Sequence, residues 1–327
     1  TFRITEAERR GELIINMADY LEPTGLNYLL DGWVLEGKPT ALFGMGGTGK
    51  TWIGLDITYC LASGIPYIGW QTPHAVPTAV YDYENDPDNT RLRLAKIAKG
   101  HQREMPKILY RQLSIPLPET EERIAQDVDE HGIKFALLDS FGLASGGGQN
   151  KDEVIIPVYA TLRRLGIATL IIDHESKASN GEYAFGNVYK HNLSRMTWQV
   201  EATKEDTDSG DLYVRVSNRK SNEGPRHKPV GIHLMFGPSA VAAKRIDVAD
   251  LPSDLVATLP LATRIMAALR TGNMDTNEIK EAVGEDGAAV NTRLKEMEKA
   301  GKIVQLHPGS KGKPAGWGLP TERQDFE

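Results

Sequence analysis

Residues Gly44-Met-Gly-Gly-Thr-Gly-Lys-Thr51 indicate the fold class, because they match the phosphate-loop pattern G-x-x-x-x-G-K-[ST] at every fixed position. An apolar run at residues 40–43 precedes it and a helix-period stretch at residues 51–63 follows it, which is the context that this motif requires. Glycines let successive backbone N–H groups approach a phosphate, and the helix N-terminus adds the positive end of its dipole. The sequence therefore predicts that ATP and its Mg²⁺ ion bind at the eight loop residues: Gly44, Met45, Gly46, Gly47, Thr48, Gly49, Lys50 and Thr51.

Three side chains are expected to work with these phosphates. Lys50 supplies a positive charge to the β- and γ-phosphates, and the Thr51 hydroxyl is a ligand of Mg²⁺. Residues 135–138 form an apolar run that ends at Asp139. A carboxylate at the carboxyl end of a strand beside a phosphate loop holds the Mg²⁺ shell, so Asp139 is the predicted Walker B acid.

A further apolar run, residues 78–81, leads into Asp82-Tyr83-Glu84. Alternation with period two places Asp82 and Glu84 on the same face of the strand. A carboxylate at this position can orient and deprotonate the water that attacks the γ-phosphate. We favour Glu84 for this role, with Asp82 as the weaker candidate.

Short apolar runs alternate with helix-period stretches over residues 38–237, as in a parallel sheet flanked by helices. The predicted buried strands are residues 40–43, 78–81, 107–110, 135–138 and 168–172. Helices are predicted at residues 51–63, 89–101, 120–131 and 152–165, and antiparallel strands at residues 211–216 and 230–235. The predicted fold class is therefore α/β, with a mostly parallel sheet flanked by helices.

A smaller C-terminal domain is predicted beyond a linker at residues 241–259. Helical segments at residues 261–270, 276–283 and 287–300 precede a loop punctuated by glycines, which indicates a winged helix-turn-helix over residues 260–320. The ATPase domain then takes residues 37–240, and residues 321–327 are a tail. Residues 1–36 are predicted as a helical arm, whose amphipathic helix at residues 5–21 packs on its own domain or on a neighbouring subunit.

Composition bounds the possible functions. The 327 residues carry a net charge of −6, which argues against a surface coated with basic residues for nucleic acid. Residues 261–320 hold nine Lys and Arg against seven Asp and Glu, so this part alone is +2. One cysteine, Cys60, excludes an intramolecular disulfide and fits a reducing compartment, so we expect a cytoplasmic protein. No apolar stretch approaches the roughly 20 residues that span a bilayer, and no membrane partner is expected.

Cationic and imidazole groups follow the later strands. Ile171-Ile-Asp-His174 ends an apolar run, and His174 could hydrogen-bond the γ-phosphate and report its presence to the segment that follows. That segment carries Lys177 and Lys190, with Arg195 beyond them. Arg219 and Lys220 end a later strand; they are either surface charges or cations that reach the γ-phosphate of a neighbouring subunit.

The ordered set of motifs resembles the RecA-like ATPases of the plasmid RepA replicative-helicase type. It comprises the phosphate loop, Tyr83-Glu84-Asn-Asp, Leu138-Asp139-Ser, Asp173-His174-Glu-Ser-Lys177 and Lys220-Ser-Asn-Glu-Gly-Pro225, within residues 27–237. The resemblance implies a ring, usually a hexamer, that hydrolyses ATP at subunit interfaces and moves along single-stranded DNA. It also implies that Glu84 is the catalytic carboxylate, that Asp139 is the Walker B acid and that His174 is the γ-phosphate sensor.

By the same resemblance, loops at residues 142–153 and 176–190 line the DNA channel, and the DNA-binding residues are Lys177, Lys190 and Arg195. The chain departs from the pattern at one position. Related ring helicases place the finger arginine two residues after a lysine, and here that residue is Asn222. Arg219 or Lys220 would have to take its place.

Three functions follow from this set of motifs. The leading one is an ATP-dependent DNA helicase of a plasmid or phage-like replication system, with other replication proteins as possible partners. The alternatives are a recombinase or recombination mediator, and a DNA-binding regulator switched by ATP. The winged helix would offer Asn291, Thr292, Arg293 and Lys295 to the major groove and Lys311 and Lys313 to the backbone, or else dock a protein.

Overall fold

A computed structural model describes residues 27–147, 151–175, 188–204, 210–310 and 312–320. The chain divides into two compact units. The first runs to Arg245, apart from the short stretch Thr203–Asp206, and the second takes that stretch together with residues 246–327. Residues 5–21, predicted as an amphipathic helix, lie outside the described residues. Among the described residues, no helix is long and apolar enough to cross a membrane.

The first unit is built on a nine-stranded sheet in its described part, with the order β11-β10-β9-β8-β3-β7-β6-β4-β5. Its centre is parallel: β3 (Pro39–Gly44) pairs with β7 (Ala168–His174) and with β8 (Met196–Ala202), and β6 (Phe135–Asp139) lies between β7 and β4 (Thr78–Asp82). Strand β5 (Ile108–Gln112) closes one edge. On the other side β9 (Leu212–Ser221) and β10 (Val230–Phe236) pair antiparallel, as expected.

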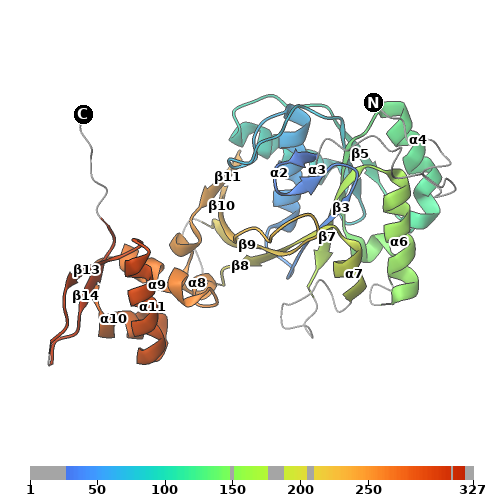
Figure 1. The fold of residues 1–327 in the computed structure, drawn as a ribbon. Helices are drawn as coiled ribbons and strands as arrows, with labels where there is room; N and C mark the ends of the chain where they lie inside the picture. Colours follow the sequence, from blue (N-terminus) through green and yellow to red (C-terminus); the bar gives the residue numbers. More distant parts are fainter. Residues whose placement is uncertain (1–26, 148–150, 176–187, 205–209, 311, 321–327) are drawn as a thin grey trace. The chain divides into compact units, whose positions relative to one another are not determined.

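Helices cover both faces of this sheet (Figure 1). Because side chains alternate along a strand, Leu137 of β6 packs into one core while its neighbours Ala136 and Leu138 pack into another. The first core also contains side chains of α2 (Lys50–Ser63) and α3 (Pro87–Gly100), and the second those of α4 (Glu121–His131) and α6 (Asp152–Leu165). The predicted α/β class, with a mostly parallel sheet flanked by helices, is confirmed.

Three parts of the sequence interpretation need correction. Residues 28–35, assigned to a helical arm, form the antiparallel hairpin β1 (Tyr28–Leu30) and β2 (Val34–Leu35), because Leu30 and Trp33 are buried in the ATPase core. Residues 241–246, assigned to a linker, form β11 (Val241–Ile246), which extends the sheet beside β10. Strand β8 was not predicted, although Met196, Trp198 and Val200 alternate with polar residues and are all buried.

The second unit contains the helices α8 (Ser253–Val256), α9 (Leu261–Arg270), α10 (Thr276–Val283) and α11 (Gly287–Lys299). Its strands β12 (Met274–Asp275), β13 (Val304–His307) and β14 (Gly316–Gly318) form a sheet with the order β12-β14-β13. Ile265, Ile279 and Leu294, one from each of the three longer helices, pack with Trp317 in a separate small core. A capping box between Asp275 and Glu278 begins α10.

Candidate nucleotide-binding site

The parallel strands bring the predicted site residues to one edge of the sheet. Gly44, the last residue of β3, pairs with His174, the last residue of β7. Asp139 ends β6 and pairs with Asp82, which ends β4. Ligands of open α/β sheets bind at this carboxyl edge, so residues far apart in the sequence meet where a nucleotide is expected.

The loop between β3 and α2 has the backbone of an anion-binding site. Gly47 and Gly49 have φ angles of 78° and 83°, a region that residues with a Cβ rarely adopt. A Cβ on Gly44 would lie 2.2 Å from the Val200 carbonyl oxygen, so only glycine fits beside β8. Helix α2 begins at Lys50 without a side-chain cap and without an acidic residue in its first turn. Its first N–H groups therefore point toward the place of a phosphate with no competing carboxylate in the first turn of the helix.

Lys50 is buried and its ammonium is held by its own loop. Nζ donates to the carbonyl oxygens of Gly44, at 2.9 Å, and Met45, at 2.6 Å. Burial lowers the pKa of Lys50, whereas the nearby carboxylates of Asp139 and Glu84 act in the opposite direction. Both carbonyl contacts are within the phosphate loop, so the ammonium already lies where phosphates would accept its hydrogen bonds.

Asp139 and Thr51 form the part of the site that suits a divalent cation. The Thr51 hydroxyl donates to Asp139 Oδ2 at 2.8 Å, while Oδ1 is buried and has no hydrogen-bond partner among the described residues. Burial raises the pKa of Asp139 to about 7, the Thr51 hydrogen bond opposes this, and the charges of Glu84 and Asp82 add to it. A hydroxyl, a carboxylate and an unpaired buried oxygen are hard ligands of the kind that Mg²⁺ prefers. The site therefore fits Mg²⁺, which Thr51 and Asp139 would hold.

Glu84 lies at the same edge, in contact with two other side chains. It accepts a hydrogen bond from the Ser140 hydroxyl, and His174 Nε2 lies 3.4 Å from its Oε1. The His174 hydrogen bond is the main cause of a lowered pKa for Glu84, against the effect of partial burial. A lowered pKa keeps the carboxylate charged, so that it can accept a hydrogen bond from water and orient it, although it also makes Glu84 a weaker base. The motif Leu138-Asp139-Ser contains Ser140, but no role was predicted for its hydroxyl.

The hydrogen bonds of Asp82 indicate a structural role. It is buried, and its Oδ1 accepts hydrogen bonds from the backbone N–H groups of Glu84, at 2.9 Å, and Asn85, at 2.8 Å. Its Oδ2 accepts a hydrogen bond from Thr90 at 2.9 Å. Both oxygens are used in closing the turn that carries Glu84, which favours Glu84 over Asp82 as the base.

The cations predicted to act between subunits or on DNA lie in different surroundings. Lys190 is fully buried and does not reach the surface. Its Nζ lies 2.8 Å from the Asp173 carboxylate and over the ring of Phe141. These contacts fix the short helix α7 (Val188–Leu193) to the end of β7. That position offers no charge to a DNA strand. The Arg195 side chain is 45% exposed and lies 3.9 Å from Glu223. Lys177 and Lys311 lie outside the described residues.

Arg219 and Lys220 are anchored within their own subunit. The Arg219 guanidinium donates to Gln199 Oε1, at 2.7 Å from Nε. Lys220 Nζ donates to the carbonyl oxygens of the C-terminal end of α7 and its flank, each at 2.8 Å: His191, Asn192 and Ser194. The carbonyls hold the Lys220 ammonium away from its own phosphate loop.

Together the phosphate loop, the Thr51–Asp139 pair and Glu84 define a P-loop ATPase with a RecA-like core. A family profile described as an AAA domain matches residues 6–180, more than half of the 327 residues. The chain belongs to the AAA domain family.

Comparison with solved structures agrees with this fold. A KaiC-like protein from the hyperthermophilic archaeon Pyrococcus horikoshii OT3 superposes with a TM-score of 0.50 and 17% sequence identity, over 68% of this chain and 99% of that one. At this identity the likeness concerns the fold alone. No curated protein matches the chain in sequence.

The contrast between Glu84 and Asp82 gives the first prediction. Glu84→Gln should lower ATP turnover by about 10²–10⁴-fold while nucleotide binding persists, because the variant keeps the shape and loses the base. Asp82→Asn should instead lower the melting temperature, since the buried carboxylate accepts two backbone N–H groups. Steady-state ATPase rates, fluorescent-nucleotide binding and thermal unfolding measure these effects. A catalytic loss confined to Asp82→Asn, with Glu84→Gln active, would transfer the role to Asp82.

The second prediction follows from the pKa of Asp139. The folded chain holds this proton up to about pH 7, while the ordinary value is 3.8, so the folded state binds more protons between these values. Its contribution to the free energy of unfolding must then fall as pH rises through this window. Without nucleotide or Mg²⁺, Asp139→Asn should be increasingly more stable than the wild type from pH 4 to pH 7. A difference in melting temperature between the two proteins that stays constant from pH 4 to pH 7 would show that Asp139 does not titrate in this range.

Proposed function

We propose that this chain is a ring-forming, ATP-dependent DNA helicase or translocase of a plasmid or phage-like replication system. The observation that carries the proposal is the 3.4 Å contact between His174 and Glu84. A γ-phosphate between Lys50 and Glu84 would compete for the same imidazole. Binding and hydrolysis would then move His174, which precedes the expected DNA loop, as a motor requires. Of the predicted range 176–190, residues 176–187 lie outside the described residues and residues 188–190 belong to α7.

A complete hydrolytic set favours a motor over a regulator that is only switched by ATP. A switch needs the phosphate loop and the Mg²⁺ ligands, but it gains nothing from a charged carboxylate placed to activate water. Glu84 contacts both Ser140 and His174 at the edge of the sheet that carries the phosphate loop. These contacts favour repeated hydrolysis coupled to movement of the chain after β7.

Assembly into a hexameric ring is supported by the positions of Arg219 and Lys220. Lys220 pairs with Thr197 of β8, which pairs with Ala41 of β3, three residues before Gly44. At about 3.3 Å per residue, the backbone of Lys220 lies about 10 Å from the carboxyl edge that carries the phosphate loop. At that distance Lys220 suits the site of a neighbouring subunit better than its own, whereas the Arg219 guanidinium lies nearer the edge, on Gln199, which pairs with Phe43. Arg219 is the stronger candidate, because one glutamine side chain holds it, whereas three backbone carbonyls hold Lys220.

The C-terminal unit suits a winged helix-turn-helix that contacts DNA or a replication protein. Helices α9, α10 and α11, with β12 between the first two and β13 and β14 after the third, are compatible with that motif. Helix α11 would be the recognition helix, because its exposed side chains include Asn291, Thr292, Arg293 and Lys295. In the loop between β13 and β14, Lys313 is exposed.

The third prediction tests the motor directly. Single-stranded DNA should raise the ATPase rate by about tenfold or more, because a motor couples hydrolysis to movement along bound DNA. The native mass should be that of a hexamer. The rate is measured with and without DNA, alongside native mass and strand displacement from a forked duplex. Filaments on DNA with no strand displacement would indicate a recombinase. An ATPase rate indifferent to single-stranded DNA, with ATP-dependent duplex binding, would indicate a regulator.

The fourth prediction tests whether Arg219 acts across an interface. Arg219→Ala and Lys50→Ala should each be inactive alone, whereas an equal mixture should regain activity at about a quarter of the interfaces, where an intact Lys50 meets an intact Arg219. Arg226→Ala, a change of an exposed arginine in the turn after β9, is the matched control and should stay active without a partner. No recovery at any mixing ratio would contradict a role in trans.

A further inference from the structure

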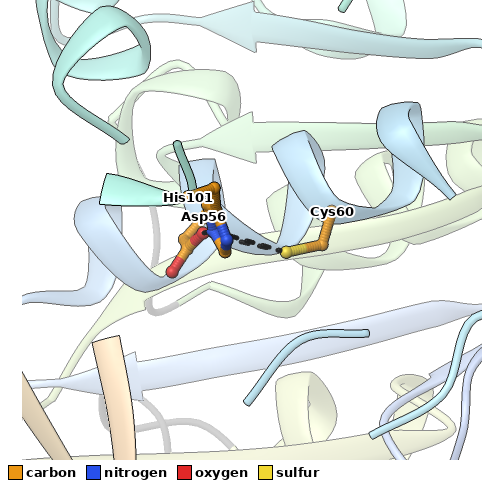
Figure 2. A group of neighbouring side chains, drawn as sticks. All are labelled: Asp56, Cys60 and His101. Carbon is orange, nitrogen blue, oxygen red and sulfur yellow. Dashed lines mark hydrogen bonds and ion pairs between the residues drawn. The ribbon is translucent and has the colours of Figure 1, made fainter. Parts of the chain in front are cut away.

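A second group of reactive side chains lies in the ATPase core, away from the phosphate loop. Asp56 and Cys60 are one turn apart on α2, and His101 follows the end of α3 (Figure 2). His101 Nε2 lies 2.6 Å from Asp56 Oδ1, and Cys60 Sγ lies 3.8 Å from each of these two atoms. A carboxylate, a thiol and an imidazole, from two helices, therefore meet at one point.

The spacing of these atoms is close to that of ligands around one ion. All three potential ligand atoms lie within 4.8 Å of one another. Around a tetrahedral Zn²⁺, with Zn–S near 2.3 Å and Zn–N or Zn–O near 2.0 Å, ligand atoms stand about 3.3–3.5 Å apart. The imidazole and carboxylate would separate by about 0.7 Å and the sulfur would approach by about 0.3 Å, which small side-chain rotations can supply.

The surrounding residues hold the group in place. Cys60 and Asp56 are on the same face of one helix, the arrangement by which residues four apart bind a metal together. The ring of Tyr59 stacks on the His101 ring, with centroids 5.0 Å apart, and the Tyr59 hydroxyl donates to the Glu104 carbonyl oxygen at 2.9 Å. A fixed imidazole is a common feature of metal sites, where contacts around the ligands set the ring orientation.

We propose that Asp56, Cys60 and His101 bind one Zn²⁺ ion, or a divalent metal of similar softness, with water as the fourth ligand. Thiolate and imidazole select such metals over Mg²⁺. The His101 side chain is 25% exposed, which leaves solvent access for the ion and the water. Cys60 lies nine residues beyond Thr51, about 13 Å along the helix, so this site is separate from the Mg²⁺ site of the nucleotide.

A redox role for Cys60 fits the structure less well. The Cys60 side chain is fully buried. Reactive cysteines have solvent access, so that oxidants can reach the sulfur. A bound metal would instead clamp α2, whose first turn carries Lys50 and Thr51, to the end of α3, and so brace the helix that supports the phosphate loop.

Cobalt titration of the untagged, metal-stripped chain tests the proposal. One equivalent of Co²⁺ should produce a thiolate-to-cobalt charge-transfer band, which only Cys60 can supply because the chain has a single cysteine. The visible bands should have the intensity of tetrahedral coordination, Zn²⁺ should displace them, and Mg²⁺ with ATP should not. A wild-type protein with no charge-transfer band would overturn the proposal.

Variants separate this site from a surface histidine. Cys60→Ser should lose the charge-transfer band, and His101→Gln should weaken Co²⁺ binding by at least about tenfold. His131→Gln is the matched control, because His131 also lies at the C-terminal end of a helix, α4, and should leave binding unchanged. Zn²⁺ should raise the melting temperature of the wild type and of His131→Gln but not of Cys60→Ser. Equal Co²⁺ affinity in His101→Gln and His131→Gln would contradict the site, whether or not Cys60→Ser folds.

Discussion

Parallel pairing of β3, β7, β6 and β4 is the constraint on which the site depends. It aligns Gly44 with His174 and Asp139 with Asp82, so the phosphate loop, both carboxylate-bearing strand ends and the histidine reach one edge. Helices on each face bury the alternating side chains of these strands and keep the register fixed. A shift of one residue in β6 would exchange its two faces and separate the Thr51–Asp139 pair.

The same edge concentrates negative charge. Asp82, Glu84 and Asp139 lie close together at this edge. The ammonium of Lys50, held by its loop, lies near Asp139 and Glu84 and is attracted by their charges. Burial and this crowding raise the pKa of Asp139 to about 7, which means that its charged form is costly without a partner. Mg²⁺ and the helix N-terminus would relieve that cost and place the γ-phosphate beside Glu84. The site is thus strained in its electrostatics before the nucleotide binds, and the nucleotide completes it.

The sequence predicted most of this edge, because the phosphate loop and the acidic strand ends are local patterns. It predicted β3, β4, β6 and β7 within two residues of their bounds. It missed the N-terminal hairpin, since Trp33 becomes part of the core only by stacking on Trp198, with ring centroids 4.3 Å apart, far along the chain. The contacts of Lys190 and His101 could not be predicted for the same reason. Each contact depends on which elements pack together in the fold, and the local spacing of residues does not indicate this.

The most direct test of the central claim, that the phosphate loop binds and hydrolyses ATP, is the ATPase rate of Lys50→Ala. Lys50 contacts its own loop carbonyls and lies at the N-terminus of α2, so its removal should leave the fold intact by circular dichroism. Hydrolysis should be abolished, because no other positive charge is held within the loop to meet the β- and γ-phosphates. A folded Lys50→Ala variant that hydrolyses ATP at a near-native rate would contradict the assignment of the site.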